Sequence, residues 1–257
     1  MYIGKIPPTV WHNSTTIVLF PFALLLFYKQ YQSIISKKPL RWTSILVTSL
    51  LVLLNAFAKP SFLLVYIPVT SFFLIKNIGK EQLCTILIKL MPIILGTVIV
   101  SSYFVILYIL GGNDLNEPTH SISLSIPFEV YTKRTPIFYF PFSLILTFTF
   151  PITFYLLYPN QLYTTLTKYS LSLTVLGILI SKVVIENGPR KFDGNFYWQN
   201  VICCYLMVIV TLMSLFSQSQ KTAISRRNKK ILSFVFSIHV VSGIVYLLKI
   251  FLTRKYQ

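Results

Sequence analysis

Acidic residues are scarce in this sequence. Its 257 residues include six Asp and Glu against 23 Lys and Arg, and charged residues make up 11% of the chain. A soluble domain carries about a quarter charged residues. With so few charges and 54% hydrophobic residues, the chain cannot cover its surface with polar groups, which excludes an ordinary water-exposed globular fold. Lipid must replace water over much of the surface, so the composition predicts an integral membrane protein.

Cysteine and clustered metal ligands are also scarce. The three cysteines, Cys84, Cys203 and Cys204, lie in or beside apolar runs, without the spacing of a metal site or of a disulfide framework. No H-x-x-x-H or clustered carboxylate pattern occurs, so we expect no metal site, and no cofactor is identified. A signal peptide is not expected, because polar residues and prolines precede the first apolar run and no small-residue cleavage site follows it.

Long apolar runs make up most of the sequence. Inside a bilayer every backbone N–H and C=O needs an internal partner, which leaves helices or a closed barrel. The runs are continuous and do not alternate, which favours helices. We expect an all-α polytopic membrane protein with about eight transmembrane helices (seven to nine), short loops and no soluble domain, residues 1–257 forming one multi-pass domain. The expected segments are 15–28, 42–58, 61–75, 86–110, 136–158, 169–185, 198–216 and 231–252.

Basic residues are distributed unevenly among the connections between these segments. The first, third, fifth and seventh connections are basic, whereas the second is short and the fourth and sixth balance their cations with acids. Since cytoplasmic loops retain Lys and Arg, the odd connections are predicted to be cytoplasmic, and the N-terminus and even connections extracytoplasmic. Arg254 and Lys255, near the C-terminus, do not fit this pattern. The net charge of +17 indicates anionic membrane lipid as a partner and no nucleic acid, because the cations lie in links between apolar runs.

Unusual polar strings lie on the predicted outer side, at 4–13, 58–62, 113–129 and 186–198, together with five of the six acids. Interfacial turns with aromatic anchors explain each string taken alone equally well. Because all of these strings are predicted to lie on the same side of the membrane, a functional site is favoured over separate interfacial turns. We expect a lipid phosphate to be bound there by cations, and a carboxylate to act as general base on an acceptor hydroxyl.

Particular residues are assigned to these roles. Glu186 and Asp193 are the catalytic candidates, because their loop would hold them beside the cations. The substrate-binding candidates are Lys59, Arg190 and Lys191 for the phosphate, with Trp11, His12, Asn195 and Trp198 for the remaining contacts. Tyr197 is a further residue that could stack on a sugar, and His120 a further one for acid–base work.

Three of these strings carry a resemblance. VWHNST (10–15), AKPSF (58–62) and ENGPRKFDGNFYW (186–198) resemble bacterial polytopic membrane proteins that are similar to GT-C class glycosyltransferases, which use polyprenyl-phosphate sugars. The resemblance implies the C-terminal part of a larger GT-C-like fold in a bacterial plasma (cytoplasmic) membrane. It also implies sugar transfer from a lipid-linked sugar donor in cell-envelope glycan synthesis, at an extracytoplasmic active site. The acidic motif that the class carries near its N-terminus has no match, since no acid precedes Glu81.

Two other functions stay open. One is a transporter or flippase for a lipid-linked or small polar substrate, and the other is a non-catalytic subunit working with other envelope-glycan proteins. The absence of an internal repeat speaks against a transporter. Polar groups inside the apolar segments have structural explanations: Lys182 is expected to extend to the interface, while Asn55 and His239 are expected to hydrogen-bond neighbouring helices.

Overall fold

The computed structural model describes residues 14–37, 40–77, 81–106, 122–124, 127–133, 136–186, 195–221 and 225–253. Helices form most of these ranges, as expected of an all-α chain, and one short two-stranded sheet accompanies them. The elements are α1 (Ser14–Ile35), α2 (Trp42–Ala58), η1 (Pro60–Phe62), α3 (Leu63–Ile75), α4 (Leu83–Val105), β1 (Ile122–Leu124), α5 (Glu129–Thr132), α6 (Tyr139–Thr147), α7 (Thr149–Leu157), η4 (Pro159–Tyr163), α8 (Thr165–Val183), β2 (Val184–Glu186), η5 (Asn195–Tyr197), α9 (Trp198–Lys221) and α10 (Arg226–Thr253).

Several helices are long and apolar enough to cross a membrane. Among the described residues, α1, α4, α8, α9 and α10 meet this condition singly. Two further pairs meet it only together, because no single helix in them is long enough. Both pairs are bent, α2 with η1 and α3 by 119° and α6 with α7 by 62°. Each expected segment overlaps a described helix, and the general prediction of apolar, membrane-compatible helices is confirmed.

Proline explains both bends. Pro151 has no N–H for the carbonyl of Thr147 four residues earlier, and α6 ends at Thr147. In α7, Pro151 falls in the first turn, where no intrahelical donor is needed. At the other bend, Lys59 precedes Pro60 and is extended, with φ −172° and ψ 118°, so α2 cannot continue.

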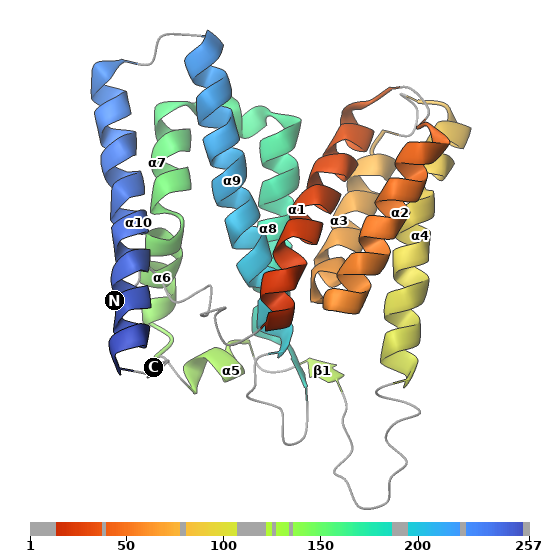
Figure 1. The fold of residues 1–257 in the computed structure, drawn as a ribbon, viewed down its shortest axis with the longest axis horizontal. Helices are drawn as coiled ribbons and strands as arrows, with labels where there is room; N and C mark the ends of the chain where they lie inside the picture. The colour runs from red at the N-terminus through yellow and green to blue at the C-terminus, as the bar shows by residue number, and fades with distance from the viewer. Residues whose placement is uncertain are drawn as a thin grey trace, which may run out of the picture.

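The helix connections fall into two groups at opposite ends of the bundle (Figure 1). At one end, α1 meets α2, α3 meets α4, α7 meets α8 and α9 meets α10. We call this end the basic end, because its cations include Lys37, Arg41, Lys76, Lys168, Arg226 and Arg227. We call the opposite end, which holds α5, β1 and β2, the strand end. The connections predicted to be basic therefore share one end of the fold.

Two apolar clusters hold the bundle together. The larger one joins residues of α1, α2, α3, α4, α8 and α9, with Phe62, Tyr66 and Tyr169 fully buried at its centre. The smaller one joins α7, α9 and α10 around Phe150 and Phe154. Large apolar side chains still cover the outer faces of α4 and α10, as expected of helices that face lipid.

A buried ion pair joins the connections at the basic end. The Lys89 ammonium in α4 lies 2.6 Å from a carboxylate oxygen of Glu81, and these side chains are 0% and 4% exposed. Lys89 also donates a hydrogen bond to the carbonyl of Ser36, just after α1. The Asn77 amide donates to Glu81 at 3.3 Å and to the Ile34 carbonyl at 3.2 Å. One polar cluster thus ties α1 to the α3–α4 connection.

Two polar groups inside the bundle allow a comparison with expectation. The prediction for Asn55 was wrong, because its amide donates to Leu51 one turn earlier in its own helix, at 2.7 Å. The prediction for His239 stays a prediction, because its Nε2 atom is buried without a hydrogen-bond partner among the described residues.

Candidate functional site

Two of the predicted substrate-binding residues meet at the strand end. The Lys59 ammonium lies 4.4 Å from the ring centroid of Trp198, the first residue of α9. Lys59 is half-buried in the turn between α2 and η1, and Trp198 is buried. The α2–α3 turn therefore presents a cation to the start of α9, although the two segments are far apart in the sequence.

A second cation lies beside this contact, enclosed by aromatic rings. The Lys182 ammonium, in the last turn of α8, lies 4.2 Å from the Tyr197 ring centroid, 4.6 Å from that of Tyr131 and 5.5 Å from that of Phe140. It also donates a 3.2 Å hydrogen bond to the Tyr197 hydroxyl. Phe128 packs edge-on against Phe140, with centroids 4.7 Å apart. We call Lys182 with these four rings the Lys182 box.

The backbone at the box is unusual. Phe128 has φ 72°, the one positive φ of a non-glycine residue among those described. A bulky residue in this region costs about 1–2 kcal/mol, so other contacts must compensate. One such contact is the Phe128 N–H, which donates to the Lys182 carbonyl at 2.9 Å and so satisfies a carbonyl at the end of α8. Strained residues of this kind gather at functional sites, which draws attention to the box.

The short sheet adjoins the box in sequence. β2 follows α8 directly and pairs antiparallel with β1, so the backbone of Glu186 is opposite that of Ile122. The catalytic candidate Glu186 is therefore in an element that begins two residues after Lys182. η5 then leads into α9 through Tyr197 and Trp198, which contact the two cations.

Among the described side chains, the box contains a cation and no anion. No described carboxylate lies within ion-pair distance of Lys182, and its residue is 4% exposed. The hydroxyl oxygen of Tyr131 is buried as well, and within the described ranges it has no hydrogen-bond partner. A buried ammonium and a buried phenol with unused hydrogen-bonding capacity therefore lie side by side.

The other sequence candidates are placed only in part. Glu186 and Asn195 lie in elements at the strand end, and their backbones alone are described. Trp11, His12, His120, Arg190, Lys191 and Asp193 lie outside the described residues. Of the nine predicted site residues, the structure thus brings Lys59 and Trp198 into contact and leaves the remaining side chains untested.

The surroundings of Lys182 were not expected from the sequence. Tyr131, Phe140 and Tyr197 surround its ammonium and bury it, whereas the expected position at the membrane interface stays a prediction. Sequence reasoning did not identify Tyr131 and Phe140 as its neighbours. The available signal was a lysine within an apolar run, with aromatic residues concentrated at the ends of other runs.

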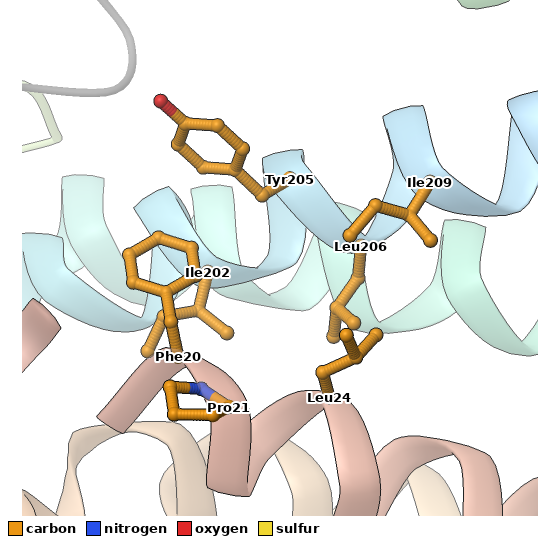
Figure 2. Close-up of a pocket in the computed structure, with 7 residues that line it drawn as sticks. All are labelled: Phe20, Pro21, Leu24, Ile202, Tyr205, Leu206 and Ile209. Atoms are coloured by element: carbon orange, nitrogen blue, oxygen red, sulfur yellow. The ribbon is translucent and has the colours of Figure 1, made fainter. Parts of the chain in front are cut away.

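An apolar pocket opens between α1 and α9, with a volume of about 110 Å³. Its lining residues are Phe20, Pro21, Leu24, Ile202, Tyr205, Leu206 and Ile209. Figure 2 shows the hydroxyl of Tyr205 directed away from the other lining side chains. The lining offers hydrocarbon and no described acid or base, so the pocket suits an alkyl or prenyl chain better than a polar molecule.

The comparisons with known proteins were made against protein-family models, curated proteins and solved structures, and none of the three finds a match. Across the described residues, no group of three or more His, Cys, Asp or Glu side chains is arranged to hold a metal ion. Interpretation of the site therefore depends on its own residues.

Proposed function

We propose that the chain is a GT-C-like membrane glycosyltransferase, or the C-terminal portion of one, which transfers a sugar from a lipid-phosphate donor in cell-envelope glycan synthesis. The observation that carries the proposal is the contact of Lys59 with Trp198. Both residues were assigned to substrate binding from the sequence, and they pair a cation with an aromatic face at the end that also holds Glu186. A cation of this kind can bind a phosphate, and an aromatic face can stack on a sugar ring.

The proposed topology has eight membrane crossings. The bent region of α2, η1 and α3 contributes two of them, and the bent pair of α6 and α7 contributes one. The basic end would face the cytoplasm, because retained Lys and Arg mark cytoplasmic loops. The strand end would then be extracytoplasmic. Reporter fusions after Lys59, Glu117, Asp193 and Gln257 should all report an extracytoplasmic position. A cytoplasmic position for the fusions after Glu117 and Asp193 would remove the shared outer site.

The proposed reaction uses residues of the strand end in distinct roles. Glu186 or Asp193 takes the proton from an acceptor hydroxyl, whose oxygen then bonds to the anomeric carbon of the donor sugar. The bond between that carbon and the phosphate oxygen breaks, and the lipid phosphate leaves with the electron pair. Lys59, Arg190 and Lys191 stabilise the charge of the departing phosphate. Trp11, His12, Asn195 and Trp198 position the sugar.

Replacement of the proposed base gives the direct test. Glu186→Gln should lower the rate of sugar transfer about 100-fold or more, since general bases contribute this much and the amide cannot accept the proton. The measurement is incorporation of labelled sugar from a polyprenyl-phosphate donor by proteoliposomes that contain the purified chain. Arg190→Gln should mainly raise KM for the donor, because it removes a phosphate contact.

A matched control is available at the same end. Glu129 in α5 is an acid to which no role is assigned, so Glu129→Gln should leave transfer close to that of the wild type. Undiminished transfer by both Glu186→Gln and Asp193→Asn would eliminate the catalytic assignment. Absence of transfer by the wild-type chain would instead favour the non-catalytic subunit.

A further inference from the structure

The described side chains compensate the burial of the Lys182 charge only in part. Removing an ammonium from water is costly unless hydrogen bonds and opposite charge replace the solvent. Three ring faces and the Tyr197 hydroxyl supply part of this compensation. An ammonium has three N–H donors, and Lys182 uses one of them, in its bond to Tyr197, among the described residues. Two donors thus remain for an acceptor that the described part of the chain does not supply.

The Tyr131 hydroxyl separately indicates that a hydrogen-bonding partner is needed here. Buried phenols nearly always find a hydrogen-bond partner, yet the Tyr131 hydroxyl has none among the described residues. Its ring is 4.6 Å from the Lys182 ammonium, and the residue is 5% exposed. A single oxygen-rich anion could accept from Lys182 and Tyr131 together. Such charge-assisted bonds are the strongest hydrogen bonds in proteins.

We propose that Lys182 and Tyr131 form an anion site that binds the phosphate monoester headgroup of a membrane lipid. The identification of this lipid with the sugar donor rests on the proposed function, whereas the anion site itself does not. A phosphate monoester has several acceptor oxygens and a charge between one and two units, which suits two donor groups and a second cation. The proposal assigns the second cation to Lys59, which contacts Trp198, the residue that follows Tyr197 in the chain.

The surroundings favour a lipid over a free phosphate. The box lies at the end of α8, where a headgroup would meet a helix that crosses the bilayer. The apolar α1–α9 pocket begins at Ile202, one helical turn beyond Trp198, and could accommodate the first carbons of the tail. Phe140 and Tyr197 are partly exposed, so movement of one ring would admit the headgroup.

The experiment measures retention of a polyprenyl monophosphate by the purified chain in detergent, using native mass spectrometry. Lys182→Met should weaken retention about tenfold or more, because it removes a charge and its donors. Tyr131→Phe should weaken it several-fold and leave the melting temperature unchanged, since the ring remains. Lys168→Met is the matched control, because Lys168 lies on the same helix over a tyrosine ring, at the basic end. It should retain the lipid as the wild type does.

Three further probes distinguish the sources of phosphate. Polyprenol of the same length should not be retained, because it lacks the anion. Equal retention of phosphatidate would support a general lipid-phosphate site, and weaker retention would support a prenyl donor. Displacement of the lipid by millimolar inorganic phosphate would support recognition of the headgroup alone. Wild-type retention by both Lys182→Met and Tyr131→Phe would overturn the anion site.

Failure of this inference is separable from failure of the proposed function. A wild-type chain that retains polyprenyl phosphate through Lys182 but transfers no sugar would keep the anion site and remove the enzyme. A Lys182→Met variant with wild-type KM for the donor would remove the anion site and keep the enzyme. Should Lys182→Met fail to fold, Tyr131→Phe decides, because it deletes one hydroxyl from an otherwise intact box.

Discussion

Lys89→Met is expected to lower the free energy of unfolding by about 3–5 kcal/mol, because it leaves the Glu81 carboxylate buried without its ion-pair partner. The pair is almost completely enclosed, with side-chain exposures of 0% and 4%, so water cannot replace the lost ammonium. The same change removes the bond from Lys89 to the Ser36 carbonyl and loosens the link between α1 and α4. For a chain of this size the melting temperature in detergent micelles should fall by roughly 10 °C.

Two further variants identify the cause of this loss. Lys89→Met combined with Glu81→Leu should recover much of the stability, because removing both members of a buried pair leaves no uncompensated charge. Lys76→Met, which changes an exposed lysine of the same connection, should shift the free energy of unfolding by no more than about 0.5 kcal/mol. If the double variant were as unstable as Lys89→Met alone, packing of the lysine stem, and not its charge, would explain the effect.

Hydropathy predicted the positions of the helices because lipid imposes one simple demand, an apolar segment of sufficient length. That demand does not fix where a helix bends. The segment expected at 136–158 is divided at Phe148, although Pro151 was visible inside it. The ring and missing N–H of Pro151 act four residues earlier, at the carbonyl of Thr147. Pro21, Pro68 and Pro92 lie inside helices that continue, so a proline in the sequence does not by itself predict where a helix breaks.

The candidate site was predictable to a similarly limited degree. Lys59 and Trp198 were selected for their chemistry and their expected side of the membrane, and the fold brings them into contact. Lys182 was interpreted from its helix alone, as a lysine near a helix end. Its actual neighbours come from α5, α6 and η5, which no periodicity in the sequence connects. Burial of a charge by residues from several elements is a property of the assembled bundle.

The second large effect is expected at Gly177, where α8 and α9 approach closely. A Cβ atom at this position would lie 3.3 Å from the sulfur of Cys203 and 3.5 Å from the Cα atom of Asn200, a backbone atom that cannot turn away. Small residues at such contacts allow helices in membranes to pack closely. Gly177→Leu must therefore separate the two helices or distort them, at a cost of about 1–3 kcal/mol or more.

Gly243 provides the matched control, because a Cβ atom built there has no atom within 4 Å. Gly243→Leu, on the outer face of α10, should leave the melting temperature in detergent unchanged or raise it slightly, because leucine favours a helix more than glycine does, whereas Gly177→Leu should lower it by several degrees. Gly177→Ala should fall between them, since one methyl group makes a tight contact but also favours the helix by up to about 1 kcal/mol. Equal melting temperatures for the two leucine variants would contradict close α8–α9 packing. Because α9 begins at Trp198 and α8 ends beside Lys182, separating these helices should also weaken lipid-phosphate retention, so Gly177→Leu connects the packing of the bundle to its candidate site.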